Sequence, residues 1–208
     1  MASLLVYYAH PGHRYSQVNR FMFEAAREVS DIDVVDLYAE YPRHNIDIDK
    51  EQQRLLDHKI ILFQCPLFWY STPSLIKEWI DLVLEHGFAY GAGGDKLAGK
   101  NLMLALTAAG PEDAYSTAGY QHFDLRTFLT PLQQTAQLCK MRFLPPYVLF
   151  ESLRAPGAEQ VEPHVEGYRQ LLVALRDGRY AVDRSDEVAL LSHTNLASLI
   201  SSAGALNE

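Results

Sequence analysis

Three short segments hold the residue types that could do chemistry in this chain. Residues 10–19 (HPGHRYSQVN) place a histidine, a glycine and a serine ahead of a helical pattern. Residues 66–72 (PLFWYST) contain three aromatic residues in a row, and residues 107–121 open with the small residues of TAAG. The first segment could bind an anion, the second could stack on a flat ligand, and the third could let a ligand approach the backbone closely.

The first segment has the features of an anion site at a helix N-terminus. Ser16 stands where it can cap the helix, and three or more successive backbone N–H groups would be free to point at a phosphate. The dinucleotide pattern GxGxxG and the P-loop pattern GxxxxGKS/T are absent from the chain. In the alternative, Ser16 is an ordinary N-cap and His10 packs over the loop, and the residues alone favour neither interpretation.

The second and third segments could form the walls of a pocket. Phe68, Trp69 and Tyr70 are consecutive, so they cannot all face the core, and at least one should flank a cavity. Residues 107–121 form a long irregular connection, which in a compact domain is usually a lid or a binding loop. The alternatives are that the aromatic residues fill the core and that the long loop is an ordinary surface loop.

The elements that must position these segments alternate between strand and helix. Strand patterns cover residues 3–9, 31–37, 59–64, 101–107 and 142–150, the last interrupted by Pro145 and Pro146. Helical patterns cover residues 16–29, a segment with Pro73 near its start, residues 123–139 with Pro131 as a break or kink, and residues 161–175. This alternation predicts an α/β fold with a parallel sheet covered on both faces.

We expect five strands in the order 2-1-3-4-5. In such a sheet, ligands bind beyond the carboxyl ends of the strands, between strands one and three. The three segments above follow strands one, three and four, so they should meet there. A length of 208 residues suits one domain. We expect this domain to span residues 1–184, followed by an appendage of residues 185–208 with a short helix over residues 189–200.

Composition and charge narrow the class of protein. The formal net charge is −8 with no block of Lys or Arg, which argues against a nucleic-acid surface. Cys65 and Cys139 lack metal or redox spacing and predict reduced core thiols, and the scattered histidines predict no metal site. The N-terminal residues have no signal-peptide pattern, so we expect a cytoplasmic protein. Two arginines, Arg14 and Arg126, could meet a 2′-phosphate, but we expect both to be solvated.

Several longer motifs make the sequence similar to a known family. They are YAHP at residues 8–11, SQVN at 16–19, DLYAEYPRHNIDI at 36–48, FQCPLFWYSTPSLIKEWID at 63–81, HGFAYGAGGDKLAGK at 86–100, PLQQTAQLCKM at 131–141 and LPP at 144–146. Together they resemble the NAD(P)H:quinone oxidoreductase family, which has a flavodoxin-like fold. The similarity is greatest to its small bacterial branch, the ancillary oxidoreductases of glutathione-gated potassium efflux systems, and it covers residues 3 to about 175.

The resemblance implies a flavin site in the three segments. The flavin phosphate would meet His10, Ser16, Gln17, Val18 and Asn19. The flavin ring would lie beside Leu67, Phe68, Trp69 and Tyr70, with Thr107, Ala108, Ala109 and Gly110 opposite. Ala108 and Ala109 replace the Thr and Gly of the family motif, so a hydroxyl that polarises the ring is lost at position 108. Tyr115 falls on the active-site tyrosine of the family, but Gln121 stands where a histidine is expected, with His122 one place later.

The resemblance also implies a function and partners. It predicts FMN rather than FAD, NAD(P)H as co-substrate, and ping-pong transfer of hydride to a quinone-like acceptor with help from Tyr115 or His122. It further predicts a homodimer that docks on the cytoplasmic face of a potassium efflux antiporter, which would be its only membrane contact. Two alternatives stay open, namely a flavin-binding regulatory subunit of that antiporter with little turnover, and a one-electron carrier of the flavodoxin type.

Overall fold

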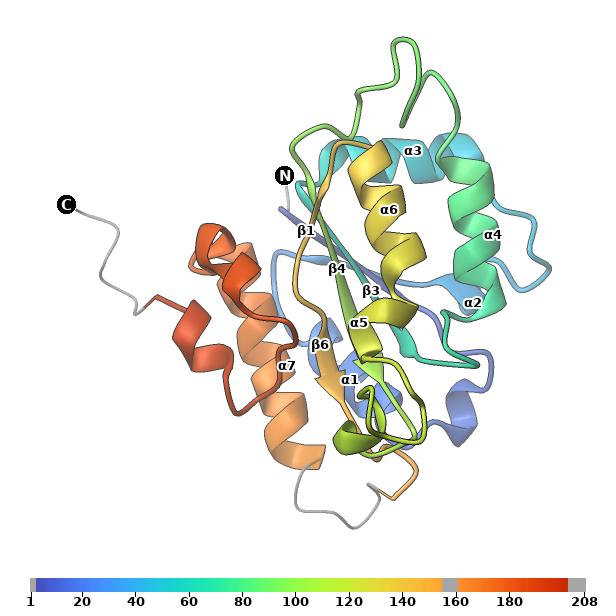
Figure 1. The fold of residues 1–208 in the computed structure, drawn as a ribbon. Coiled ribbons are helices and arrows are strands. Elements are labelled where there is room, and N and C mark those ends of the chain that lie inside the picture. Colours follow the sequence, from blue (N-terminus) through green and yellow to red (C-terminus); the bar gives the residue numbers. More distant parts are fainter. Residues whose placement is uncertain (1–2, 155–160, 202–208) are drawn as a thin grey trace.

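The computed structural model describes residues 3–154 and 161–201, which form a parallel sheet flanked by helices (Figure 1). The six strands are β1 (Leu4–Tyr8), β2 (Asp33–Asp36), β3 (Ile60–Pro66), β4 (Asn101–Thr107), β5 (Arg142–Phe143) and β6 (Tyr147–Leu149). Their order is β2-β1-β3-β4-β5, with β6 also paired to β4, and every pairing is parallel. The predicted order 2-1-3-4-5 is therefore confirmed.

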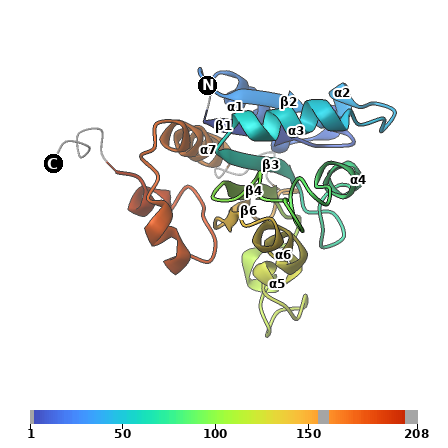
Figure 2. The same ribbon diagram turned by 90° about the horizontal axis from the view of Figure 1, so that it is seen from above.

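Helices cover both faces of the sheet, as Figure 2 shows from above. The helices are α1 (Asn19–Arg27), α2 (Leu37–Glu40), α3 (Ile48–Asp57), α4 (Ser74–Val83), α5 (Leu125–Phe128), α6 (Thr130–Leu138) and α7 (Val161–Arg176). Alternate residues of β1 separate two cores: Leu4 and Val6 pack with α1 and α7, whereas Leu5 and Tyr7 pack with α3, α4 and α6. The central strands β1 and β3 are apolar except for Gln64, because both of their faces are buried.

The prolines act as predicted. Pro73 directly precedes α4, and Pro131 lies in the first turn of α6, so that α5 and α6 are separate helices. The pair Pro145 and Pro146 divides the last strand into β5 and β6, which pair with the two ends of β4. Helix α1 begins at Asn19 rather than at Ser16, because the short 3-10 helix His13–Tyr15 and the residues after it form a loop.

Two further differences concern helices. The prediction omitted α3, whose sequence IDKEQQRLLD has few apolar residues and buries only Glu51 and Leu55. The predicted helix over residues 189–200 is wrong, because only Leu196–Leu199 form a 3-10 helix there. The backbone of Leu191 instead bonds alongside β6, accepting from the Val148 N–H and donating to the Pro146 carbonyl, at 2.8 Å each. Residues 180–201, which we call the C-terminal segment, thus lie alongside β6 at the edge of the sheet.

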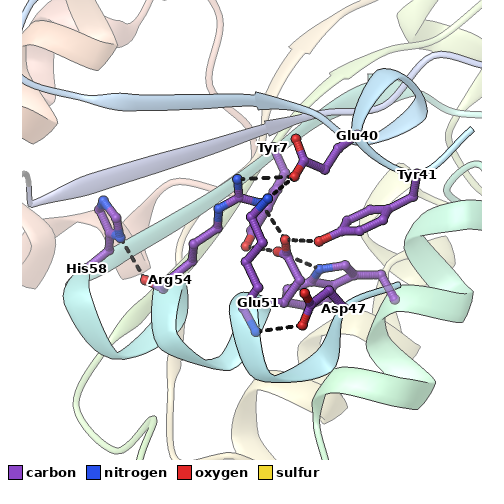
Figure 3. A network of polar contacts seen from close by, with 9 residues as sticks. Tyr7, Glu40, Tyr41, Asp47, Glu51, Arg54 and His58 are labelled. Carbon is purple, nitrogen blue, oxygen red and sulfur yellow. Dashed lines mark hydrogen bonds and ion pairs between the residues drawn. The ribbon is translucent and has the colours of Figure 1, made fainter. Parts of the chain in front are cut away.

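Helix α3 is anchored by the buried carboxylate of Glu51 (Figure 3). It accepts hydrogen bonds from the Tyr41 hydroxyl at 2.6 Å, from Trp79 Nε1 at 3.0 Å and from the hydroxyl of Tyr7, and it pairs with Arg54. Burial and the Glu51 carboxylate raise the pKa of the Tyr7 phenol, which therefore stays a donor. A fully bonded buried carboxylate joins α3 to β1 and α4, although the helix offers little apolar surface.

His164 is a second buried titratable group, on α7 beside the C-terminal segment. Its ring stacks on Tyr147 with centroids 4.4 Å apart and lies 6.1 Å from the ring of His193. Neither ring nitrogen of His164 has a hydrogen-bond partner within the described part of the chain. Burial, with a smaller contribution from His193, lowers the pKa of His164 to about 3. The folded protein therefore holds this imidazole neutral.

We predict that His164 makes the protein less stable as the pH falls from 7 to 5. In the unfolded state His164 binds a proton at the ordinary imidazole pKa, about 6.5, whereas in the folded state it does not. The contribution of His164 to the free energy of unfolding is therefore fully present above that pH and is lost as the pH falls below it. The loss of unfolding free energy between pH 7 and 5 should be about 2 kcal/mol. Urea denaturation should show that His164→Phe removes this slope and that the control His122→Gln, at an exposed position, keeps it. An unchanged slope in His164→Phe would assign the effect to other groups.

Candidate functional site

A cavity of ≈ 420 Å³ lies at the carboxyl edge of the sheet, where β1, β3 and β4 end. It is lined by His10, Gly12, Tyr15, Ser16, Gln17, Val18, Asn19, Pro66, Phe68, Thr107, Ser152 and Leu153. The three segments expected to meet at this edge all contribute to it. A larger groove of ≈ 1050 Å³ runs between α1 and α7, but helix and loop residues line it rather than strand ends. We therefore place the site in the smaller cavity.

Backbone N–H groups of the first segment are the candidates for binding an anion in the cavity. Ser16 Oγ accepts the Arg20 N–H at 3.0 Å, so the serine serves the first turn of α1. Among the described residues, the N–H groups of Gln17, Val18 and Asn19 make no hydrogen bond. Three successive free donors at a helix N-terminus carry partial positive charge and suit a phosphate.

His10 contributes to this loop without a positive charge. Its Nδ1 accepts the Gly12 N–H at 3.1 Å, which holds the turn closed. Burial, together with the neighbouring His13, lowers the pKa of His10, so the ring is neutral near pH 7. An anion in this cavity would therefore be held by backbone dipoles and hydroxyl groups rather than by the histidine.

Asn19 joins the first segment to the third. Its Nδ2 donates to Thr107 Oγ1 at 2.6 Å, and both side chains are buried. Its Oδ1 is buried and has no hydrogen-bond partner among the described residues. A buried acceptor without a partner is costly, so this atom suits the hydroxyl group of a ligand in the cavity.

The second segment forms a tight turn with unusual backbone angles. Phe68 and Ser71 exchange backbone hydrogen bonds of 2.9 and 3.0 Å, which places Trp69 and Tyr70 at the tip. Both tip residues have positive φ, 47° and 66°, which costs a non-glycine residue about 1–2 kcal/mol. Phe68 lines the cavity and the Trp69 side chain is 92% exposed. Strain of this kind concentrates at functional sites.

The third segment places an aromatic cluster beside the turn. The ring centroid of Tyr115 lies 5.5 Å from Phe150 and 6.3 Å from Phe128, which in turn lies 4.8 Å from Tyr70. Burial raises the pKa of the Tyr115 phenol, which keeps it protonated and able to donate. A Cβ atom on Gly110 would lie 2.9 Å from Tyr120 Oη and 3.3 Å from Tyr115 Cε2, so glycine lets both tyrosine side chains pack close to the backbone.

The remaining predicted site residues lie at different distances from the cavity. Leu67 is buried and donates its N–H to the Thr107 carbonyl, whereas Ala108 is buried with its N–H bonded to Leu149. Ala109 is exposed and does not line the cavity. His122 is also exposed, in a turn where its N–H bonds to Gly119, and no hydrogen bond links its side chain to Tyr115 within the described residues. Its catalytic role stays a prediction.

The sequence analysis missed Ser152 and Leu153, which close the cavity on the side of β6. Backbone hydrogen bonds run from Ser152 to Ala108 and from Glu151 to Gly110, so this loop lies along the third segment. The rule that ligands bind beyond the carboxyl ends of parallel strands also applies to the last strand, and it would have found both residues.

Neither metal nor thiol chemistry is evident at this site. Within residues 3–154 and 161–201, no group of three His, Cys, Asp or Glu side chains is placed to hold a metal ion. Cys65 and Cys139 are buried and unpaired with each other, and burial raises the pKa of both thiols. No helix in the same residues is long and apolar enough to cross a membrane.

The fold and the position of the cavity define a flavodoxin-like protein. Residues 2–173 match the family described as having the flavodoxin-like fold, and the chain belongs to this family.

Individual relatives agree with this assignment. The chain is 42% identical over 165 residues to the glutathione-regulated potassium-efflux system ancillary protein KefG of Serratia proteamaculans, covering 79% of this chain and 90% of the relative. It is 45% identical over 149 residues to the uncharacterized NAD(P)H oxidoreductase YrkL of Bacillus subtilis, covering 72% and 86%. Among solved structures, general stress protein 14 of Treponema denticola in complex with FMN superposes with a TM-score of 0.78 at 33% identity, covering 83% and 99%.

Proposed function

We propose that the chain is an FMN-dependent NAD(P)H oxidoreductase that passes hydride to a quinone-like acceptor by a ping-pong mechanism. The observation that carries the proposal is the cavity at the carboxyl edge, which is lined by Phe68 and by Gln17, Val18 and Asn19, whose N–H groups make no hydrogen bond among the described residues. Similarity to an NAD(P)H oxidoreductase and to an FMN complex supports it.

The residues of the cavity fit FMN. The N–H groups of Gln17, Val18 and Asn19 would receive the phosphate, and the unpartnered Asn19 Oδ1 would accept from a ribityl hydroxyl group. Phe68 and the strained turn after it would stand beside the ring. The backbone N–H groups of Trp69 and Tyr70 have no partner among the described residues, so they are available as donors to the ring edge.

Bound FMN would supply the redox chemistry by taking a hydride from NAD(P)H and giving it to the acceptor. The protein would contribute position and polarity. Trp69 and Tyr120, in the second and third segments, are exposed aromatic side chains that would offer apolar surface to a flat co-substrate. The protonated Tyr115 hydroxyl would donate to the negative charge that develops during transfer. Both co-substrates would use the same mouth in turn, which is why we propose a ping-pong order.

We predict that the protein binds one FMN and that Asn19→Ala weakens binding about tenfold or more, through the loss of a bond worth about 1.5 kcal/mol or more. Quenching of FMN fluorescence measures the affinity. Because the substitution also removes the bond to Thr107, thermal melting of the FMN-free variant separates cofactor loss from unfolding. The control is Asn45→Ala, at an exposed position remote from the cavity lining. Equal affinity in both folded variants would place the flavin elsewhere.

We predict that Tyr115→Phe slows reduction of the bound flavin by NADPH about 100-fold, as expected for the loss of a donor to developing charge. FMN affinity should stay within about twofold, since a buried phenyl ring retains the aromatic packing. Stopped-flow absorbance measures the single-turnover rate, with Tyr38→Phe as a control outside the cavity. A rate equal to that of the wild type would show that the Tyr115 hydroxyl does not act in the transfer.

Similarity to the KefG ancillary protein supports a partner for this activity. We propose that the chain binds the cytoplasmic face of a potassium efflux antiporter by protein–protein contacts. The regulatory alternative predicts bound FMN without turnover. Steady-state oxidation of NAD(P)H with a naphthoquinone acceptor distinguishes the two: sustained turnover favours the oxidoreductase, and its absence in the FMN-loaded protein favours the regulatory subunit.

We also propose a homodimer whose interface includes the turn at Trp69. Few apolar side chains of this region remain for a dimer interface. Trp69 and Leu82 are exposed, whereas Leu75, Ile76 and Trp79 of α4 are buried within the chain. Light scattering should give twice the chain mass of 23.5 kDa. Trp69→Glu should shift the mass toward the monomer, whereas Leu138→Glu, at an exposed residue of α6, should not. A monomer in the wild type would refute the proposal.

A further inference from the structure

A second polar cavity lies between α6, β5 and the C-terminal segment. Its volume is ≈ 410 Å³, and its polar lining includes Arg126, Gln133, Gln137, Arg142, Ser185 and Asp186. None of its lining residues belongs to the proposed flavin cavity. The family match ends at residue 173, so the wall formed by Ser185 and Asp186 lies beyond the shared fold.

Arg126 is the central group of this second cavity. Its Nη2 donates to Gln133 Oε1 at 3.0 Å, and its Cζ lies 5.1 Å from the centre of the Phe143 ring. Its Nη1 is buried and has no hydrogen-bond partner in the described part of the chain. The expectation that Arg126 is solvated was therefore wrong, because packing on Phe143 leaves the side chain partly buried.

The charge of Arg126 is also uncompensated. The other arginine of the cavity, Arg142, is paired with Asp183 at 3.0 Å and with Asp186 at 2.6 Å. Among the described residues, no carboxylate lies within ion-pair distance of Arg126. Guanidinium groups remain charged when buried, so the cavity keeps a positive charge and an unsatisfied donor.

We propose that this second cavity binds a small oxyanion, the carboxylate or phosphate group of a metabolite. Arg126 supplies the charge and the free Nη1 donor, and the Gln137 amide lines the same space. Carboxylate and phosphate oxygens match the planar donors of a guanidinium group, and burial strengthens the bond. Ser185 and Asp186 also line the cavity, so the anion would bind where the C-terminal segment packs against α6 and β5, while Asp186 stays paired with Arg142.

Isothermal titration of the FMN-loaded protein tests this proposal, because bound FMN excludes anions from the flavin cavity. The probes are inorganic phosphate and citrate, with sodium chloride at matched ionic strength as the reference. We expect saturable binding of one equivalent of at least one probe, and Arg126→Gln should weaken it at least tenfold. Arg43→Gln removes the same charge from an exposed position and should leave binding unchanged. Binding of phosphate alone or of citrate alone identifies the chemistry of the anion.

A second pair of variants covers the case in which Arg126→Gln does not fold. Gln137→Glu places a carboxylate in the cavity at an exposed residue of α6, where it would pair with Arg126 and exclude the anion. Gln134→Glu adds the same charge one turn away, outside the cavity lining, and should bind like the wild type. The proposal is overturned if neither probe binds beyond the chloride reference, or if Gln137→Glu and Gln134→Glu bind the probe equally.

Discussion

A chain of buried hydrogen bonds across the sheet holds the proposed flavin site in place. The Tyr168 hydroxyl donates to Gln64 Oε1 at 3.2 Å, Gln64 Nε2 donates to the Asn19 carbonyl at 2.8 Å, and Asn19 Nδ2 donates to Thr107 Oγ1 at 2.6 Å. These groups are buried, so each needs a partner, and only one placement of α1 over β3 and β4 supplies them. The N-terminus of α1 is thereby aimed at the cavity.

On the opposite face of the sheet, a buried charged group and its hydrogen-bond partners fix the packing. Glu51 is completely buried, and donors from β1, α4 and the loop after α2 surround it (Figure 3). Breaking such a network by removing one partner typically costs about 3–5 kcal/mol. Buried hydrogen-bonded side chains thus fix the helices on both faces of the sheet. This fixed surrounding structure can hold Trp69 and Tyr70 in their strained backbone conformation.

Much of the site could be predicted because parallel strands bring their carboxyl ends to one edge. The segments at His10, Phe68 and Thr107 were found in this way, and all three line the cavity. Other details could not be predicted from local pattern. The exposure of His122 depends on a turn at Gly119, and the role of α3 depends on a carboxylate whose partners lie far away in the chain.

The sequence by itself determined the strand and helix alternation and the breaks at Pro131 and Pro145, because apolar periodicity and proline geometry are local properties. Tertiary structure alone decided which polar atoms remain without partners. Asn19 Oδ1 and Arg126 Nη1 are distinguished only by what packs around them. Hydrogen-bond satisfaction depends on neighbours from distant parts of the chain, so no linear pattern records it.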